Sequence, residues 1–226
     1  MTMKALDLFS GTRSVADAFA RRGHRSFSVE FDRRHPNIDW YADINGITAE
    51  DILCRFGKPD VIWASPPCTT YSIAAISHHR KVGDGGFLSP KSIQAAEADD
   101  LIRHTIALIK TLKPRFYFIE NPRGGLRKMP FMQDMPRYTL TYCQYGDDRM
   151  KPTDIWTNHP DPQFKPMCRK GATCHEAAPR GSKTGTQGRR GSINRSKIPA
   201  LLCDHIAEIC ENEIKKERRG RECSIG

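Results

Sequence analysis

A cysteine that directly follows two prolines is the first group in this sequence that could act as a nucleophile. The apolar run 60–65 precedes it and predicts a buried strand that ends at Ser65, because Pro66 and Pro67 cannot donate to a strand ladder. Cys68 is therefore expected on a rigid loop at the carboxyl end of a strand, the edge where open α/β sheets bind ligands. A thiol held there can attack an electron-poor carbon. A buried cysteine beside a turn is the alternative, since free cysteines are often buried.

A carboxylate stands at the end of a later strand. Residues 115–119 form an apolar run that predicts this strand, and Glu120, Asn121 and Pro122 follow it. A thiolate and a carboxylic acid together suit addition to an electron-poor ring, with the acid protonating a ring nitrogen. Cys68 and Glu120 can meet if the strands that precede them are neighbours in one sheet.

A pocket of nucleoside size is predicted near the amino terminus. A buried strand over 4–9 leads into a turn with Gly11 and a helix from about Ser14, and a second strand over 25–31 carries Glu30 near its end. Backbone N–H groups at a helix start can face a ligand, and a carboxylate there can hold ribose hydroxyls. A single glycine is a weak fingerprint, because the triple-glycine dinucleotide pattern is absent.

Strands alternate with helices along most of the chain, which predicts an α/β fold with a doubly wound, mostly parallel sheet. A long helix is expected to begin with Ser89 as its cap and Pro90 as its first residue. Residues 66–90 hold few apolar anchors and are expected to form a mobile loop that acts as a closing lid. Three cysteines fall in apolar helical patterns and are expected in the core: Cys54, Cys203 and Cys210.

The net charge of +10 is concentrated in one segment, which we call the basic segment, residues 165–197. It holds nine Lys or Arg and one acid, Glu176. Such a concentration fits contact with phosphate backbones, and a solvated flexible loop is the alternative. No apolar run is long enough to span a membrane, and no signal peptide is visible, so a cytoplasmic location is expected.

Residues of the types that bind metal ions also lie in the basic segment and before it. Cys168 and the pair Cys174-His175 lie within it, while Cys143 and His159 lie upstream. A small region that is poor in apolar residues gains stability from a tetrahedral zinc ion. The spacing of these residues is not a strong zinc signature, so free thiols in a polar loop remain the alternative.

Taken together and in order, four motifs resemble those of the DNA cytosine-5 methyltransferases: LDLFSGTRSVADAF, VEFD, ASPPCTTYS and FIENPRGGL. The terminal RSKIPALLCDHIAEIC resembles the last motif of that family, whose helix packs against the cofactor pocket. The matches cover residues 4–158 and 193–210, and the short chain resembles compact, phage-borne members. The resemblance implies a Rossmann-like methyltransferase domain formed by 1–158 with 193–226, and a small target-recognition-like insert over 159–192.

The resemblance further implies the cofactor S-adenosyl-L-methionine and the substrate DNA. Glu30 would bind the ribose hydroxyls, Phe31 would stack on the adenine, and Asp43 would accept from the adenine amino group. The full set of cofactor residues implied by the resemblance is Phe9, Gly11, Thr12, Glu30, Phe31, Asp43, Ile44 and Pro67.

In the same family pattern, Cys68 would add to carbon 6 of a flipped-out cytosine and make carbon 5 able to accept the methyl group. Glu120 would bind the ring nitrogen and the exocyclic amine. The family usually carries two arginines ahead of a later strand, where this chain has Lys151 and then Thr153 or Asp154. Lys151 could replace one arginine, and the second has no clear counterpart.

The target-recognition region of the family is much longer than the 36 residues between Asn158 and Arg195. Recognition is therefore expected to be relaxed in sequence or supplied by a protein partner. Three alternatives stay open: an RNA (tRNA) cytosine-5 methyltransferase, a cytosine-N4 methyltransferase, whose Ser-Pro-Pro-Tyr motif differs from this chain at Cys68, and an inactive nucleic-acid-binding subunit.

Overall fold

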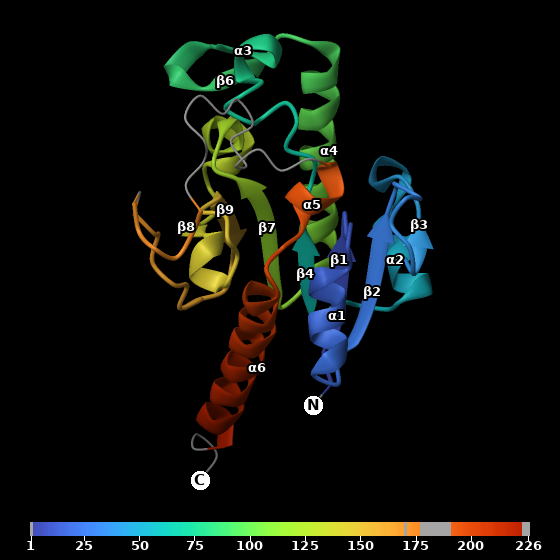
Figure 1. Ribbon diagram of the computed structural model, residues 1–226. Coiled ribbons are helices and arrows are strands. Elements are labelled where there is room, and N and C mark those ends of the chain that lie inside the picture. The colour runs from blue at the N-terminus through green and yellow to red at the C-terminus, as the bar shows by residue number, and fades with distance from the viewer. Residues whose placement is uncertain (1, 170, 177–190, 223–226) are drawn as a thin grey trace.

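The computed structural model describes residues 2–169, 171–176 and 191–222, and its centre is a seven-stranded sheet (Figure 1). The strand order is β3-β2-β1-β4-β7-β9-β8, in which the first five strands are parallel. Strand β9 runs antiparallel to both β7 and β8. The strands are β1 (Lys4–Leu8), β2 (Arg25–Glu30), β3 (Trp40–Tyr41), β4 (Val61–Ala64), β7 (Phe116–Pro122), β8 (Arg137–Thr141) and β9 (Pro152–Thr157).

This arrangement confirms the predicted doubly wound, mostly parallel sheet. The central strands are apolar on both sides because helices cover both faces of the sheet, and all four residues of β4 are buried. Chain order reverses between β1 and β4, so the crevice beyond their carboxyl ends is the topological switch point where such sheets bind ligands. The helices are α1 (Ser14–Arg21), α2 (Ala49–Arg55), α3 (Ile76–His79), α4 (Ile93–Leu112), α5 (Ser192–Ser196) and α6 (Ala200–Glu222).

Two hydrophobic cores hold the helices against the sheet. Helices α1 and α6 share one face, where Phe19 packs in the same core as Leu202 and Ile206. Helices α2 and α4 cover the other face through residues such as Ile52 and Ile106. No helix within the described residues is both long and apolar enough to cross a membrane.

An ion-pair cluster joins α1 to the terminal helix α6. Arg22, just after α1, donates from Nε and Nη2 to Glu211 at 2.8 and 2.8 Å. His24 Nε2 lies 3.0 Å from the same carboxylate. The hydrogen bond from Arg22 is the main reason that the pKa of Glu211 falls to about 2. The terminal helix is therefore fastened to the element that opens the predicted nucleotide pocket.

The segment 66–90 differs from the expectation of a mobile loop. It contains α3 and an antiparallel pair of short strands, β5 (Arg80–Val82) and β6 (Leu88–Pro90), at the top of Figure 1. The pairing places Pro90 in a strand, so the predicted start of the long helix was wrong. Helix α4 instead begins at Ile93, and its cap is Ser92, whose hydroxyl accepts from the N–H of Ala95.

One predicted core cysteine is also misplaced. Cys203 and Cys210 are buried on α6, as expected, but Cys54 is exposed. Helix α2 has only two turns and turns Ile52 inward, so the residue two positions later faces away from the core. The remaining short helical turns are η1 (Ile44–Gly46), η2 (Asp84–Gly86), η3 (Gly125–Lys128), η4 (Pro130–Met132) and η5 (Tyr142–Tyr145).

Candidate active site

The strands that precede Cys68 and Glu120 are neighbours. β4 pairs in parallel with β7, and the pairing matches Ala64 with Ile119. Cys68 follows β4 by four residues, and Glu120 is the residue after Ile119 in β7. Both groups therefore belong to the carboxyl edge of the same pair of strands, as the sequence predicted they must if they are to meet.

A hydrogen bond joins the loop that carries Cys68 to the strand that carries Glu120. The side-chain amide of Asn121 donates from Nδ2 to the carbonyl of Pro66 at 2.9 Å. Asn121 is fully buried, which shields this bond from water. The carbonyl of Cys68 accepts from the N–H groups of Tyr71 and Ser72 at 3.0 and 2.9 Å, which forms a tight turn. Cys68 itself is half-buried.

A buried ion pair anchors the far side of this turn. The guanidinium of Arg80 donates to the carbonyl and the hydroxyl of Thr70 at 3.0 and 2.9 Å. It also pairs with Asp99 at 2.8 Å, and Asp99 accepts from the hydroxyl of Tyr71 at 2.7 Å. Breaking a buried pair of this kind leaves an uncompensated charge, so the pair resists movement of the turn.

Two glycines let the loop after β7 approach the same turn. The N–H of Gly125 donates to the carbonyl of Tyr71 at 2.6 Å. A Cβ on Gly124 would stand 2.4 Å from that carbonyl oxygen, closer than any real contact. The absence of a side chain at Gly124 is therefore what allows the two loops to touch.

Glu120 is buried and held by two neighbours. The hydroxyl of Tyr142 donates to Glu120 Oε1 at 2.8 Å. Lys151 Nζ lies 3.9 Å from the same oxygen and 4.5 Å from the centre of the Tyr142 ring. Burial, followed by the nearby charge of Glu120, raises the pKa of Tyr142 well above its usual range, so this hydroxyl stays protonated and remains a donor. Lys151, which the sequence offers as a replacement for one arginine, therefore lies beside Glu120.

Asp154, one of the two residues near the second arginine position of the family, already has partners within the protein. It is fully buried, forms an ion pair with Arg127 and accepts from the hydroxyl of Thr139 at 2.8 Å. Arg127 lies in η3, which begins within the glycine pair. A cationic side chain therefore reaches Asp154 of β9 from η3.

Glu30, at the end of β2 on the other side of the switch point, accepts three backbone hydrogen bonds at the predicted nucleotide pocket. Its Oε2 accepts from the N–H of Gly11 at 2.9 Å, and its Oε1 accepts from the N–H groups of Phe31 and Asp32, each at 2.9 Å. A carboxylate offers about four acceptor positions, so these bonds leave room at Oε2 for a ligand hydroxyl. Phe31 beside it is 72% exposed, which is unusual for a large apolar ring.

The turn after β1 has a strained backbone. Phe9 has a φ of 58°, in the left-handed region that non-glycine residues rarely adopt, whereas Gly11, with a φ of 53°, adopts that region without strain. Thr12 shares a hydrogen bond of 2.8 Å with the hydroxyl of Ser14 at the start of α1. Strain of this kind concentrates at ligand-binding turns, which agrees with the predicted pocket.

The remaining predicted cofactor residues lie near the same edge. Asp43 is exposed and caps η1, accepting from the N–H of Asn45 at 3.0 Å. Ile44, by contrast, is 2% exposed and its side chain packs in the core, so a backbone contact between Ile44 and a ligand stays a prediction. Pro67 is exposed on the loop beside Cys68.

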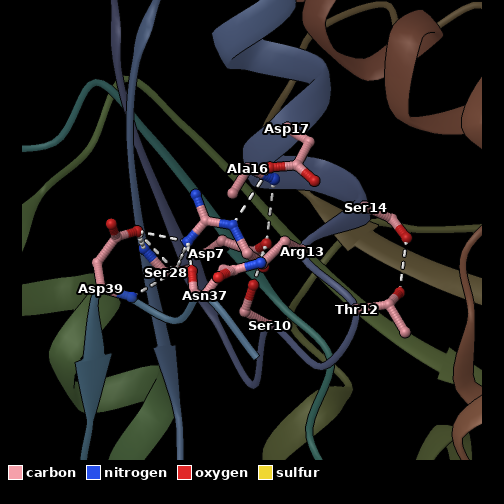
Figure 2. A network of polar contacts seen from close by, with 10 residues as sticks. All are labelled: Asp7, Ser10, Thr12, Arg13, Ser14, Ala16, Asp17, Ser28, Asn37 and Asp39. Carbon is pink, nitrogen blue, oxygen red and sulfur yellow. Dashed lines mark hydrogen bonds and ion pairs between the residues drawn. The ribbon is translucent and has the colours of Figure 1, made fainter. Parts of the chain in front are cut away.

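A polar network that the sequence did not reveal holds the turn between β1 and α1 (Figure 2). Asp7 of β1 accepts from the hydroxyl of Ser10 at 2.7 Å and from the N–H of Ala16 at 3.1 Å. Burial raises the pKa of Asp7 to about 7 against the lowering effect of these bonds. Arg13, with a φ of 59°, pairs with Asp39 at 2.8 Å and so joins α1 to the chain beyond β2.

The four cysteine and histidine residues proposed as metal ligands lie together. The ligand atoms of Cys143, Cys168, Cys174 and His175 are all within 4.8 Å of one another. His159 does not join them: it is buried, its Nε2 lies 3.2 Å from the carbonyl of Ile209, and its ring packs on Phe116.

Other contacts at the site could not be foreseen from the sequence. Asn121, Tyr142 and Asp99 act through partners that lie 55, 22 and 28 residues away along the chain. The Gly124-Gly125 pair was the one visible signal, because adjacent glycines suggest a close approach of backbone. A cavity of about 260 Å³ lies near Met3, before β1 and so at the other edge of the sheet, and none of the predicted site residues line it.

Comparisons with solved structures return methyltransferases of the Dnmt2 group. The Dnmt2 methyltransferase of S. pombe is 11% identical with a TM-score of 0.46, over 70% of this chain and 49% of that one. A DNMT2 mutant of Spodoptera frugiperda is 16% identical with a TM-score of 0.47, over 73% of this chain and 53% of that one. The present chain thus matches about half the length of these two proteins.

Sequence comparison gives the family. The profile described as C-5 cytosine-specific DNA methylase matches residues 3–132. A protein of Frog virus 3 (isolate Goorha), named a probable DNA (cytosine-5)-methyltransferase, is 30% identical over 92% of this chain and the whole length of that protein. The chain therefore belongs to the C-5 cytosine-specific DNA methylase family.

Proposed function

We propose that the protein transfers a methyl group from S-adenosyl-L-methionine to carbon 5 of cytosine in DNA through a covalent adduct with Cys68. The observation that carries the proposal is a contact between the loop of Cys68 and the strand of Glu120. Cys68 and Glu120 follow neighbouring parallel strands, and the Asn121 side chain ties the Pro66 carbonyl to the strand of Glu120 at 2.9 Å.

Cys68 supplies the nucleophile as a thiolate. Its sulfur forms a bond to carbon 6, and the electron pair of the carbon 5–carbon 6 double bond moves into the ring and onto carbon 5. Carbon 5 then takes the methyl group and loses its proton to a base. The sulfur–carbon 6 bond breaks, which restores the double bond and the thiolate. The reacting atoms lie inside the duplex stack, so the base must first be flipped out.

Glu120 acts as a carboxylic acid in this addition: its proton passes from Oε2 to the ring nitrogen and neutralises the negative charge that develops on the ring. Tyr142 and Lys151 both contact its Oε1, so we assign its Oε2 to the ring nitrogen and exocyclic amine of the base. The hydrogen bond from Tyr142 fixes the carboxyl group in place before the substrate arrives, which is the condition for electrostatic catalysis. Lys151 places a positive charge beside the same group.

The pocket beyond β1 and β2 suits S-adenosyl-L-methionine, which would supply an electrophilic methyl group when bound. Glu30 keeps an acceptor position for a ribose hydroxyl, and exposed Phe31 offers a face for the adenine. Exposed Asp43 can accept from the adenine amino group, while Ile44 contributes backbone. Phe9, Gly11 and Thr12 line the turn, and Pro67 separates the cofactor from the base.

DNA is the substrate that the family match favours, and the basic charge of the chain suits its phosphates. The nine Lys or Arg of the basic segment would contact phosphates, which position the protein without reading the sequence. We assign 1–158 with 193–226 to catalysis and 159–192 to target contact, although buried His159 packs with the catalytic core. Residues 177–190 lie outside the described part of the chain. An insert this short leaves room for a partner that supplies specificity.

Base-resolution mapping of cytosine methylation tests the proposal. Duplex DNA is incubated with the protein and S-adenosyl-L-methionine, and the same reaction is run with Cys68→Ser and with Cys54→Ser as the matched control. We expect 5-methylcytosine with the unchanged chain and with Cys54→Ser, and none with Cys68→Ser. Methylation of the exocyclic amine, of tRNA alone, or by Cys68→Ser would each refute the proposed chemistry or substrate.

A further inference from the structure

We propose that Cys143, Cys168, Cys174 and His175 bind one structural zinc ion that fastens the basic segment to the hairpin beside Glu120. The three thiols and the imidazole come from two segments that are 25 residues apart at their nearest. Their ligand atoms nevertheless lie within 4.8 Å of one another. This inference does not depend on the proposed methyl transfer.

The sulfur–nitrogen distances in the cluster match a tetrahedral zinc site, and its one printed sulfur–sulfur distance is shorter than such a site gives. With zinc–sulfur bonds of about 2.3 Å and zinc–nitrogen bonds of about 2.0 Å, the ligand atoms stand about 3.4–3.8 Å apart. Cys168 Sγ lies 3.7 Å from His175 Nδ1, and Cys174 Sγ lies 3.6 Å from the same nitrogen. Cys168 Sγ and Cys174 Sγ are 3.3 Å apart, which is too far for a disulfide bond.

The set of donors points to zinc and to a structural role. Three thiolates and one imidazole are soft ligands that suit zinc rather than magnesium or calcium. Four protein ligands fill a tetrahedral shell and leave no position for water or substrate, as in structural rather than catalytic zinc sites. The cluster therefore has no direct part in the chemistry at Cys68.

Hydrogen bonds hold the two segments together around the cluster. The N–H of Cys168 donates to the hydroxyl of Thr141 at 2.8 Å, and the N–H of Lys165 donates to the hydroxyl of Tyr145 at 2.9 Å. Further along, the N–H of Glu176 donates to the carbonyl of Asp148 at 2.9 Å. These contacts hold the ligands in place before a metal arrives.

The described residues of the segment 165–176, which are 165–169 and 171–176, have little apolar packing of their own. Of these residues, Met167 is exposed, and Cys168 is the buried hydrophobic side chain within this stretch. A segment that cannot bury a core needs another source of order, and a bound metal is a common one. Zinc would supply that order where the basic segment meets the rest of the fold.

The position of Cys143 connects this site to catalysis. Cys143 lies in η5 directly after Tyr142, whose hydroxyl donates to Glu120 at 2.8 Å. A metal bound at Cys143 would restrain that turn and so restrain Tyr142. Loss of zinc is expected to loosen the support of Glu120 as well as the basic segment.

Metal analysis of the purified full-length chain tests the proposal. Protein is produced in zinc-supplemented medium, and bound zinc is measured for the unchanged chain, Cys168→Ser, Cys174→Ser and the control Cys54→Ser. We expect about one zinc ion per chain for the unchanged protein and Cys54→Ser, and less than about a tenth of that for the two ligand variants. Chelation should lower the thermal midpoint of the unchanged protein by several degrees.

Cobalt substitution keeps the test decisive if a ligand variant fails to fold. Co²⁺ bound by the unchanged chain should give the absorption of a tetrahedral site with thiolate charge transfer, which zinc displaces. The proposal is overturned if the folded, unchanged chain carries no stoichiometric zinc and gives no such spectrum. It is also overturned if Cys168→Ser and Cys174→Ser retain full zinc. Methylation activity enters none of these readouts, so failure here is distinct from failure of the proposed enzymatic function.

Discussion

A single added methyl group at Gly124 should push the loop that follows the strand of Glu120 away from the turn that carries Cys68. In Gly124→Ala, the new Cβ would stand 2.4 Å from the carbonyl oxygen of Tyr71. That carbonyl also accepts from the N–H of Gly125 at 2.6 Å, so both interactions act on one atom. The φ of Gly124 is −166°, outside the left-handed region that favours glycine, so the contact with Tyr71 is the main effect expected.

The size of the effect follows from this distance. Carbon and oxygen settle at about 3.3 Å or more, so the loops must move apart by roughly 0.9 Å. Overpacking of this kind costs about 1–3 kcal/mol, and weakening the Gly125 hydrogen bond adds about 1 kcal/mol. A displacement of about 1 Å between reacting groups lowers a catalytic rate by about 100-fold.

Two measurements separate these effects. Urea unfolding gives the free energy of unfolding, and single-turnover methyl transfer on the folded protein gives the rate. Gly220→Ala is the matched control, because nothing lies within 4 Å of its added Cβ near the end of α6. We expect this control to keep its rate and to be as stable as the unchanged protein or slightly more so.

Unchanged stability together with an unchanged single-turnover rate in Gly124→Ala would contradict this prediction. The close approach at Tyr71 would then not hold the Cys68 turn against the strand of Glu120. A loss of stability with an unchanged rate would show that the contact supports the fold but does not set the position of the reacting groups.

Three further predictions concern groups around the sheet. The folded pKa of Asp7 is about 7, above the unfolded value, so ionisation of Asp7 opposes folding. The unchanged protein should therefore lose on the order of 4 kcal/mol of unfolding free energy as the pH rises from about 4 to about 7, and Asp7→Asn should not show this loss. Arg22 lowers the folded pKa of Glu211 to about 2, so the unchanged protein should lose unfolding free energy as the pH falls from about 4.5 toward 2. Glu211→Gln should lower the unfolding free energy at pH 7 by about 1–3 kcal/mol and should not show that loss at low pH. Tyr142→Phe should slow methyl transfer about tenfold through loss of the hydrogen bond to Glu120, with little change in DNA affinity.

Each of these variants has a control on the same kind of residue. Asp134→Asn changes an exposed carboxylate and serves as the control for both charge variants, so it should leave the stability–pH curve nearly unchanged. Tyr117→Phe removes a half-buried hydroxyl elsewhere on β7 and should keep the rate. Equal effects in a variant and its control would contradict the assigned contact.

The placement of Cys68 and Glu120 could be predicted because it depends on local rules. Prolines end a strand, parallel strands share a carboxyl edge, and apolar runs mark buried strands. Those rules need only the neighbouring sequence and the assumption that the two strands pair. The pairing of β4 with β7 confirmed that assumption.

The supporting contacts could not be predicted because they depend on which loops meet. Ser89 and Ser92 are equally good helix caps, and the pairing of residues 88–90 with β5 decides between them. In the same way, Cys168 and Cys143 become neighbours through the hairpin of β8 and β9, at a separation that no short motif records. Burial and pairing across the chain override local preference at these positions.

The most direct test of the central claim is mass analysis of the adduct between the protein and DNA that contains 5-fluorocytosine. Fluorine at carbon 5 cannot leave as a proton does, so the sulfur–carbon 6 bond should persist after methyl transfer. The account predicts one DNA strand bound per chain, attached at Cys68, and none with Cys68→Ser. Stable methylation of ordinary DNA with no trapped adduct, or an adduct at another residue, would contradict it.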